Sequence, residues 1–72
     1  MFIITEDNCQ NCKLLKTILD NNNQAVEYIK ASENMELCKE LNIKTIPALV
    51  TDDKTVVFGI QEIATEVEKA NG

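Results

Sequence analysis

The feature that most constrains this chain is a pair of cysteines three positions apart, in the segment Cys9-Gln10-Asn11-Cys12. An apolar, β-branched run at residues 2–5 comes before the pair, and a run with helical spacing of apolar residues follows it. A strand that turns into a helix here would place Cys9 at the start of the helix. Unpaired backbone N–H groups and the helix dipole favour negative charge there, so we expect Cys9 to be a reactive thiolate.

Hydrophobic periodicity along the chain predicts seven elements in the order βαβαββα. The predicted ranges are strand 2–5, helix 11–21, strand 25–29, helix 32–42, strands 48–51 and 55–58, and a helix from residue 60. Ser32 is predicted to cap the second helix, and Asn42 to end it in a left-handed conformation. A βαβ unit implies a parallel strand pair, and a hairpin implies an antiparallel one. We therefore expect an α/β fold in which three helices flank a mixed four-stranded sheet.

Apolar stripes on the helices indicate which side chains form the core. The first helix carries Leu14, Leu15, Ile18 and Leu19, and the last carries Ile60, Ile63, Ala64 and Val67. These stripes have the spacing of helices that bury one face. Cys38 lies on the apolar side of the second helix, where a free cysteine packs as a small hydrophobe; a regulatory thiol is the alternative. Phe58 fits either the core or a partner groove.

Length and charge set the class of protein and exclude some partners. A chain of 72 residues is long enough for one small domain, which we expect to span 1–72. Twelve acidic residues against seven lysines give a net charge of −5, which disfavours nucleic acid and anionic lipid as partners. No apolar run approaches the roughly 20 residues of a membrane span, and the amino terminus does not resemble a secretory signal. We expect a cytoplasmic monomer.

The cysteine count separates redox chemistry from a structural framework. The chain has three cysteines, Cys9, Cys12 and Cys38, and no histidine. An odd number of cysteines disfavours a secreted disulfide scaffold, and the CxxC spacing beside a βαβ pattern favours a redox motif. A zinc site uses about four ligands, so it would need a carboxylate or a second chain. A module that holds zinc or an iron–sulfur cluster stays open as the alternative function.

Three separated segments carry a family resemblance. They are Cys9-Gln10-Asn11-Cys12 with Lys13 behind it, Thr45-Ile46-Pro47, and Gly59 between the last strand and the last helix. In this order the chain resembles the thioredoxin superfamily, and most closely its short glutaredoxin branch. The resemblance covers essentially the whole chain and implies the thioredoxin-like, glutaredoxin-type fold.

The resemblance also implies how the site works. Cys9 and Cys12 would be the catalytic pair, and the Ile46–Pro47 bond would be cis. A bound partner would pair with the backbone of Ile46 like an added strand. The residues expected to contact the partner are Gln10, Asn11, Lys13, Thr45, Ile46, Pro47 and Gly59.

The expected activity is that of a thiol–disulfide oxidoreductase. Cys9 would attack the disulfide of a partner protein, and Cys12 would resolve the mixed disulfide. The product would be a Cys9–Cys12 disulfide that an external reductant reopens, so no cofactor besides this pair is expected and no metal is assigned. The helix terminus, together with Lys13, would lower the pKa of Cys9.

Departures from the glutaredoxin pattern bear on the reductant. Glu6 and Asp7 stand where glutathione-using glutaredoxins carry a basic residue, and acidic side chains oppose an anionic ligand such as glutathione. The segment Phe58-Gly59-Ile60 resembles that of glutaredoxin-like hydrogen donors of ribonucleotide reductase, which are reduced by thioredoxin reductase. We therefore expect a disulfide-containing protein such as ribonucleotide reductase as the substrate, and thioredoxin reductase rather than glutathione as the reductant.

Overall fold

The computed structural model describes residues 1–71 of the chain. Its elements in chain order are β1 Phe2–Thr5, α1 Gln10–Asn21, β2 Glu27–Lys30, a 3₁₀ turn η1 Ala31–Glu33, α2 Met35–Glu40, β3 Ala48–Val50, β4 Val56–Phe58 and α3 Ile60–Asn71. The predicted order of strands and helices is therefore confirmed, with η1 added before α2.

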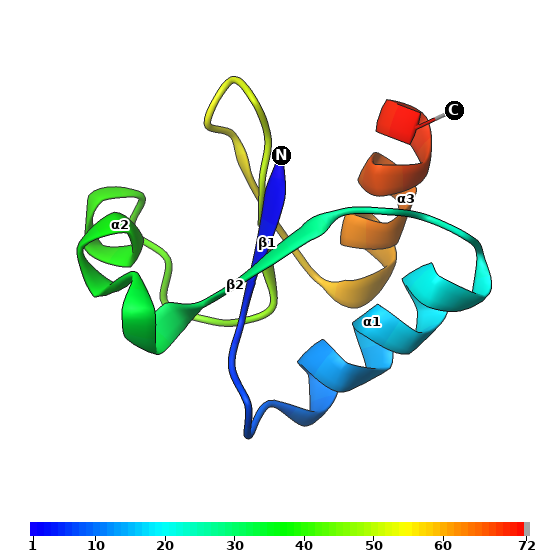
Figure 1. Cartoon of the computed structure of the whole chain (residues 1–72). Helices are drawn as coiled ribbons and strands as arrows, with labels where there is room; N and C mark the ends of the chain where they lie inside the picture. Colours follow the sequence, from blue (N-terminus) through cyan, green and yellow to red (C-terminus); the bar gives the residue numbers. More distant parts are fainter. Residues whose placement is uncertain (72) are drawn as a thin grey trace.

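The strands form one mixed sheet in the order β2-β1-β3-β4. β1 pairs with β2 in parallel, while β3 pairs antiparallel with both β1 and β4. Helices α1 and α3 lie on one side of the sheet and α2 lies on the other (Figure 1). This arrangement is the α/β layering that the βαβ and ββ connections predicted, and it agrees with the thioredoxin-like fold that the resemblance implied.

The core lies between the sheet and the pair of helices α1 and α3. Ile3 on β1 is paired with Leu49 on β3, and both are fully buried on the face that meets these helices. The helices contribute the fully buried side chains Leu15, Leu19, Ile63 and Val67. Because side chains alternate along a strand, the buried residues Ile4 and Ala48 point to the other face of the sheet.

The start of the second helix differs from the prediction. Ser32 lies inside η1, and α2 begins only after Asn34, so the prediction of Ser32 as the N-cap was wrong. The backbone N–H of Ser32 donates to the carboxylate of Glu6 at 2.8 Å, and the N–H of Asn34 donates to the carbonyl of Ala31 at 3.0 Å. A tertiary contact and a tight turn thus occupy the first residues of the predicted helix. Its end is as expected, because Asn42 has a φ of 58°.

Burial corrects two predictions about the core. Leu14 is 51% exposed, because α1 buries the single stripe of Cys12, Leu15 and Leu19, and Leu14 stands about 100° away from Leu15. Cys38 is only half-buried, like Leu37, and α2 contains no fully buried residue. Phe58 is also exposed. No helix in the described part of the chain is long and apolar enough to cross a membrane.

Candidate active site

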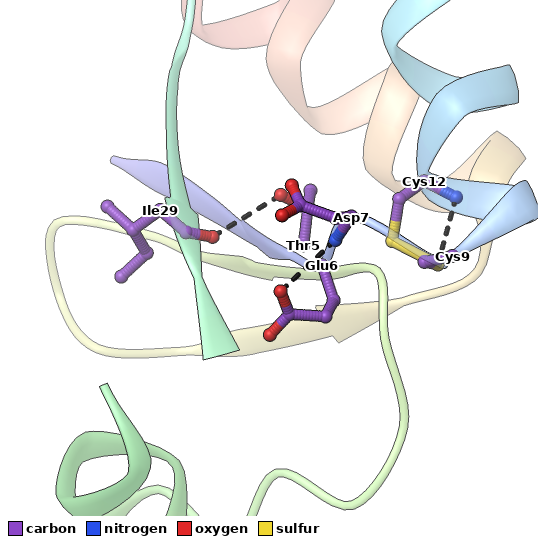
Figure 2. The surroundings of a disulfide bond; sticks show 6 residues. All are labelled: Thr5, Glu6, Asp7, Cys9, Cys12 and Ile29. Carbon is purple, nitrogen blue, oxygen red and sulfur yellow. Dashed lines mark hydrogen bonds between the residues drawn. A yellow bond between two sulfur atoms is a disulfide. The ribbon is translucent and has the colours of Figure 1, made fainter. Parts of the chain in front are cut away.

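The cysteine pair lies where β1 leads into α1. Cys9 is the N-cap of α1 with extended backbone angles, and its carbonyl accepts a hydrogen bond from the N–H of Lys13 at 3.2 Å. The N–H of Cys9 donates to the carbonyl of Glu6, also at 3.2 Å, which closes the turn between strand and helix. A disulfide joins Cys9 to Cys12 across the first helical turn, with the two Cα atoms 5.2 Å apart. Figure 2 shows the bond at the helix start.

The two sulfurs of the pair have different surroundings. Cys9 is partly exposed, whereas Cys12 is only 3% exposed. The backbone N–H of Cys12 donates to the sulfur of Cys9 at 3.1 Å, as the dashed line in Figure 2 shows. Negative charge on the outer sulfur would therefore be stabilised by a hydrogen bond as well as by the helix dipole. The Cys9 sulfur is thus the more accessible of the two to a partner, and Cys12 lies buried behind it in the same turn.

Most of the residues expected to contact a partner share one hollow. This hollow, of about 450 Å³, is lined by Asn11, the segment Thr45–Pro47 and Gly59. The Ile46–Pro47 bond is cis, as the resemblance implied, and Pro47 is buried directly before β3. Ile60, Gln61 and Glu62 in the first turn of α3 complete the lining. The topology therefore brings together three segments that are far apart in the sequence.

The backbone conformation at residue 59 requires a glycine. Its φ is +94°, in a region that side-chain-bearing residues rarely adopt, and an added Cβ would meet the carboxylate of Glu62. Its carbonyl accepts a hydrogen bond from the N–H of Ile63 at 2.9 Å, which begins α3. A glycine here lets the chain turn from β4 into α3 at the edge of the hollow.

Two of the expected partner-binding residues lie elsewhere. Gln10 is exposed in the first turn of α1. Lys13 lines a different hollow, of about 190 Å³, together with Cys12, Lys16 and Tyr28. The ammonium group of Lys16 lies 5.6 Å from the centre of the Tyr28 ring. The prediction did not include Lys16, although its position four residues after Cys12 places it on the same face of α1.

Tyr28 is the buried polar group of this second hollow. Its hydroxyl is buried, and within residues 1–71 it has no hydrogen-bond partner. Burial raises the pKa of Tyr28, and the negative charge of Asp20 raises it further. The phenol therefore stays neutral across the physiological range.

The acidic residues before the motif have partners of their own. The carboxylate of Glu6 accepts hydrogen bonds from the N–H groups of Ser32 and Asp7, and hydrogen bonding to Ser32 is the main reason that the pKa of Glu6 is lowered. Asp7 forms an exposed ion pair with Lys30 at 3.0 Å, and this contact raises the pKa of Lys30. Glu6 is therefore ionised at neutral pH, and Lys30 partly balances the acidic charge.

A family model for the thioredoxin domain matches residues 2–70. The chain belongs to the thioredoxin domain family. Comparison with curated proteins and with solved structures gave no match. The family match confirms the expected superfamily, while the glutaredoxin branch stays a prediction. A thioredoxin domain that carries a Cys9–Cys12 disulfide supports a thiol–disulfide redox role in general.

The positions of the side chains bear on the alternative of a metal-binding thioredoxin domain. Among the residues that the structure describes, no group of three or more His, Cys, Asp or Glu side chains is arranged to hold a metal ion. Cys9 and Cys12 would thus need further ligands from another molecule to form a tetrahedral site.

Proposed function

We propose that this thioredoxin domain is a dithiol–disulfide oxidoreductase that reduces disulfides in partner proteins. The observation that supports it best is the asymmetry of the pair: Cys9 is partly exposed at the start of α1, and Cys12 is buried one turn behind it. An exposed, activated thiolate can attack a partner, and a buried thiol within the same turn can resolve the product.

The reaction proceeds in two exchanges. The Cys9 thiolate attacks one sulfur of the partner disulfide, the S–S bond breaks, and the released thiolate takes a proton from water. Cys12 then loses its proton and attacks the Cys9 sulfur, which forms the Cys9–Cys12 disulfide and releases the second partner thiolate. Two electrons pass from the dithiol to the partner. An external reductant then restores the dithiol.

The hollow at Ile46–Pro47 is the proposed place for the partner chain. An extended segment that carries the partner's cysteine would pair with the backbone of Ile46, as peptides add to exposed strand edges. Thr45 and Gly59 would border this segment, and Asn11 would lie on the side of the cysteine pair. A partner bound in this way brings its disulfide to the exposed sulfur of Cys9.

For the partner and the reductant, we propose ribonucleotide reductase and thioredoxin reductase. The Phe58-Gly59-Ile60 segment, with its resemblance to glutaredoxin-like hydrogen donors, suggests the partner. The ionised Glu6 beside the motif supports a reductant other than the anionic glutathione. Asp7 adds to this charge, although Lys30 pairs with it.

Insulin reduction tests the proposed activity. With dithiothreitol as the electron source, the wild-type protein should accelerate insulin precipitation, while Cys9→Ser should not and Cys38→Ser should match the wild type. The metal content of the purified protein is measured in parallel. Stoichiometric zinc or iron that survives dialysis, together with no insulin reduction, would favour the metal-binding alternative.

A two-cuvette comparison tests the reductant. One cuvette contains glutathione with glutathione reductase, the other contains thioredoxin reductase, and NADPH consumption is followed in both with the same disulfide substrate. We expect faster turnover with thioredoxin reductase. Glu6→Gln/Asp7→Asn should raise the rate with glutathione, and fast turnover of the wild type with glutathione would contradict the assignment.

A further inference from the structure

A second, mostly apolar groove lies beside the proposed partner site, between α2 and the segment that leads to the cis proline. Its apolar lining is Ala31, Met35, Cys38, Ile43 and Ile46, and its volume is about 420 Å³. We call it the α2 groove. Met35 is 62% exposed although it is a large apolar side chain. Concave, mostly apolar clefts of about this volume are typical of sites that bind another molecule.

Continuity with the partner site indicates what occupies the α2 groove. Ile46 lines both the groove and the hollow at Pro47. A partner chain that pairs with the backbone of Ile46 is therefore already at the mouth of the groove. Side chains of an extended segment alternate in direction, so a residue close to the partner's cysteine can point into it.

The charged residues at the α2 groove indicate what kind of partner segment it would bind. Lys39 and Lys44 both line it, and neither has a carboxylate within 4 Å among residues 1–71. The acids Glu33, Glu36 and Glu40 line an adjoining hollow, which shares Ser32 and Met35 with the α2 groove. The groove therefore carries two positive charges, although the chain as a whole has a net charge of −5. Such an arrangement is complementary to an apolar side chain next to a carboxylate.

We propose that the α2 groove binds the partner segment beside the target cysteine, and that it selects an apolar residue with an acidic neighbour. The apolar side chain contacts Met35 and Ile43, and the acid lies toward Lys39 and Lys44. This proposal rests on the proposed function, because it specifies the substrates that Cys9 reduces fastest.

Two synthetic peptides test it. Each has one intramolecular disulfide whose cysteines are flanked by Leu-Glu in the first peptide and by Leu-Lys in the second. The wild type should reduce the acidic peptide with about fivefold higher kcat/KM, since exposed ion pairs contribute modestly. Lys39→Glu/Lys44→Glu should reverse this preference. Lys54→Glu/Lys69→Glu, which changes the net charge equally, should retain it. Replacing Leu by Ser in the acidic peptide should lower kcat/KM for the wild type.

The neutral disulfide of 2-hydroxyethanethiol separates the possible failures. If the wild type reduces neither it nor the peptides, the proposed function itself fails. If all variants reduce it equally but the wild type does not distinguish the peptides, the α2 groove proposal is overturned and the oxidoreductase assignment stands. Equal effects of the two lysine pairs would show a net-charge effect and would also overturn it. A further outcome would overturn the α2 groove proposal: a wild-type protein that sediments as a dimer and a Met35→Asp variant that sediments as a monomer. A second copy of the chain would then fill the groove.

Discussion

The hydrogen bond from the backbone of Cys12 to the sulfur of Cys9 gives the sharpest prediction about reactivity. Cys12→Pro and Cys12→Ala both remove the thiol of residue 12, but only the proline variant also removes its backbone N–H. The difference between the two variants therefore reports the effect of this N–H alone. Residue 12 lies in the first turn of α1, where proline is tolerated because the N–H has no carbonyl partner within the helix. Both variants carry Cys38→Ser, so that Cys9 is the single thiol.

The expected magnitude follows from the donor at 3.1 Å. A hydrogen bond to a charged group contributes about 1.5–3 kcal/mol, which corresponds to roughly a 10- to 150-fold change in an equilibrium constant. If the same N–H faces the Cys9 thiolate after reduction, Cys12→Pro raises the pKa of Cys9. Its ratio of thiolate to thiol at a fixed pH then falls by about tenfold or more relative to Cys12→Ala.

Thiolate absorbance in the ultraviolet, measured against pH, reports this ratio directly. Alkylation by iodoacetamide gives an independent check. A tenfold loss of thiolate slows this reaction by only about threefold, because a more basic thiolate is also a better nucleophile. Circular dichroism confirms that both variants are folded. Identical titration curves for the folded proline and alanine variants would refute the role of this N–H, and activation of Cys9 would have to come from the helix dipole or a side chain.

Three further predictions concern the fold around the site. Gly59→Ala should lower the free energy of unfolding by about 1–2 kcal/mol, because the φ of residue 59 is +94°. Adding Glu62→Ala should relieve the contact between the new Cβ and the Glu62 carboxylate but leave the backbone strain. Full recovery of stability in urea denaturation would therefore contradict the strain at residue 59. Leu15→Ala should cost about 2–5 kcal/mol and Leu14→Ala less than about 1, and equal costs would contradict their different burial. Because the folded-state pKa of Glu6 is depressed below the unfolded value near 4.5, its stabilisation is complete above that value and is lost as the pH falls through the folded-state pKa. The difference in urea midpoint between the wild type and Glu6→Gln should therefore shrink on acidification, and a constant difference from pH 7 to pH 3 would contradict the shift.

Local signals in the sequence were sufficient where a single residue type meets a single backbone requirement. Cys9 was expected at the helix start, and it is the N-cap. Asn42 was expected to end the second helix in a left-handed conformation, and Gly59 to separate the last strand from the last helix. Both have positive φ. The cis bond at Pro47 is different: about 5–6% of X-Pro bonds in folded proteins are cis, so the residues alone would favour trans. That expectation came from the family resemblance.

Contacts between distant segments account for most of what the sequence did not reveal. Ser32 is of a residue type that commonly caps helices, but its backbone N–H donates a hydrogen bond to the carboxylate of Glu6, which lies 26 residues earlier. Leu14 belongs to an apolar run, and only the packing of α1 against the sheet shows that it lies outside the buried stripe. Tyr28 was not among the predicted site residues, because its place beside Cys12 depends on the pairing of β1 with β2.

Trapping of the mixed disulfide tests the central claim most directly. In a Cys38→Ser background, Cys12→Ser and Cys9→Ser are each incubated with the neutral disulfide of 2-hydroxyethanethiol and analysed by intact-mass and peptide mass spectrometry. The account predicts a stable adduct on Cys9 in the Cys12→Ser variant and much slower reaction of Cys12 in the Cys9→Ser variant. An adduct that forms equally fast on Cys12, or no adduct on Cys9, would contradict the proposal that Cys9 is the attacking thiolate.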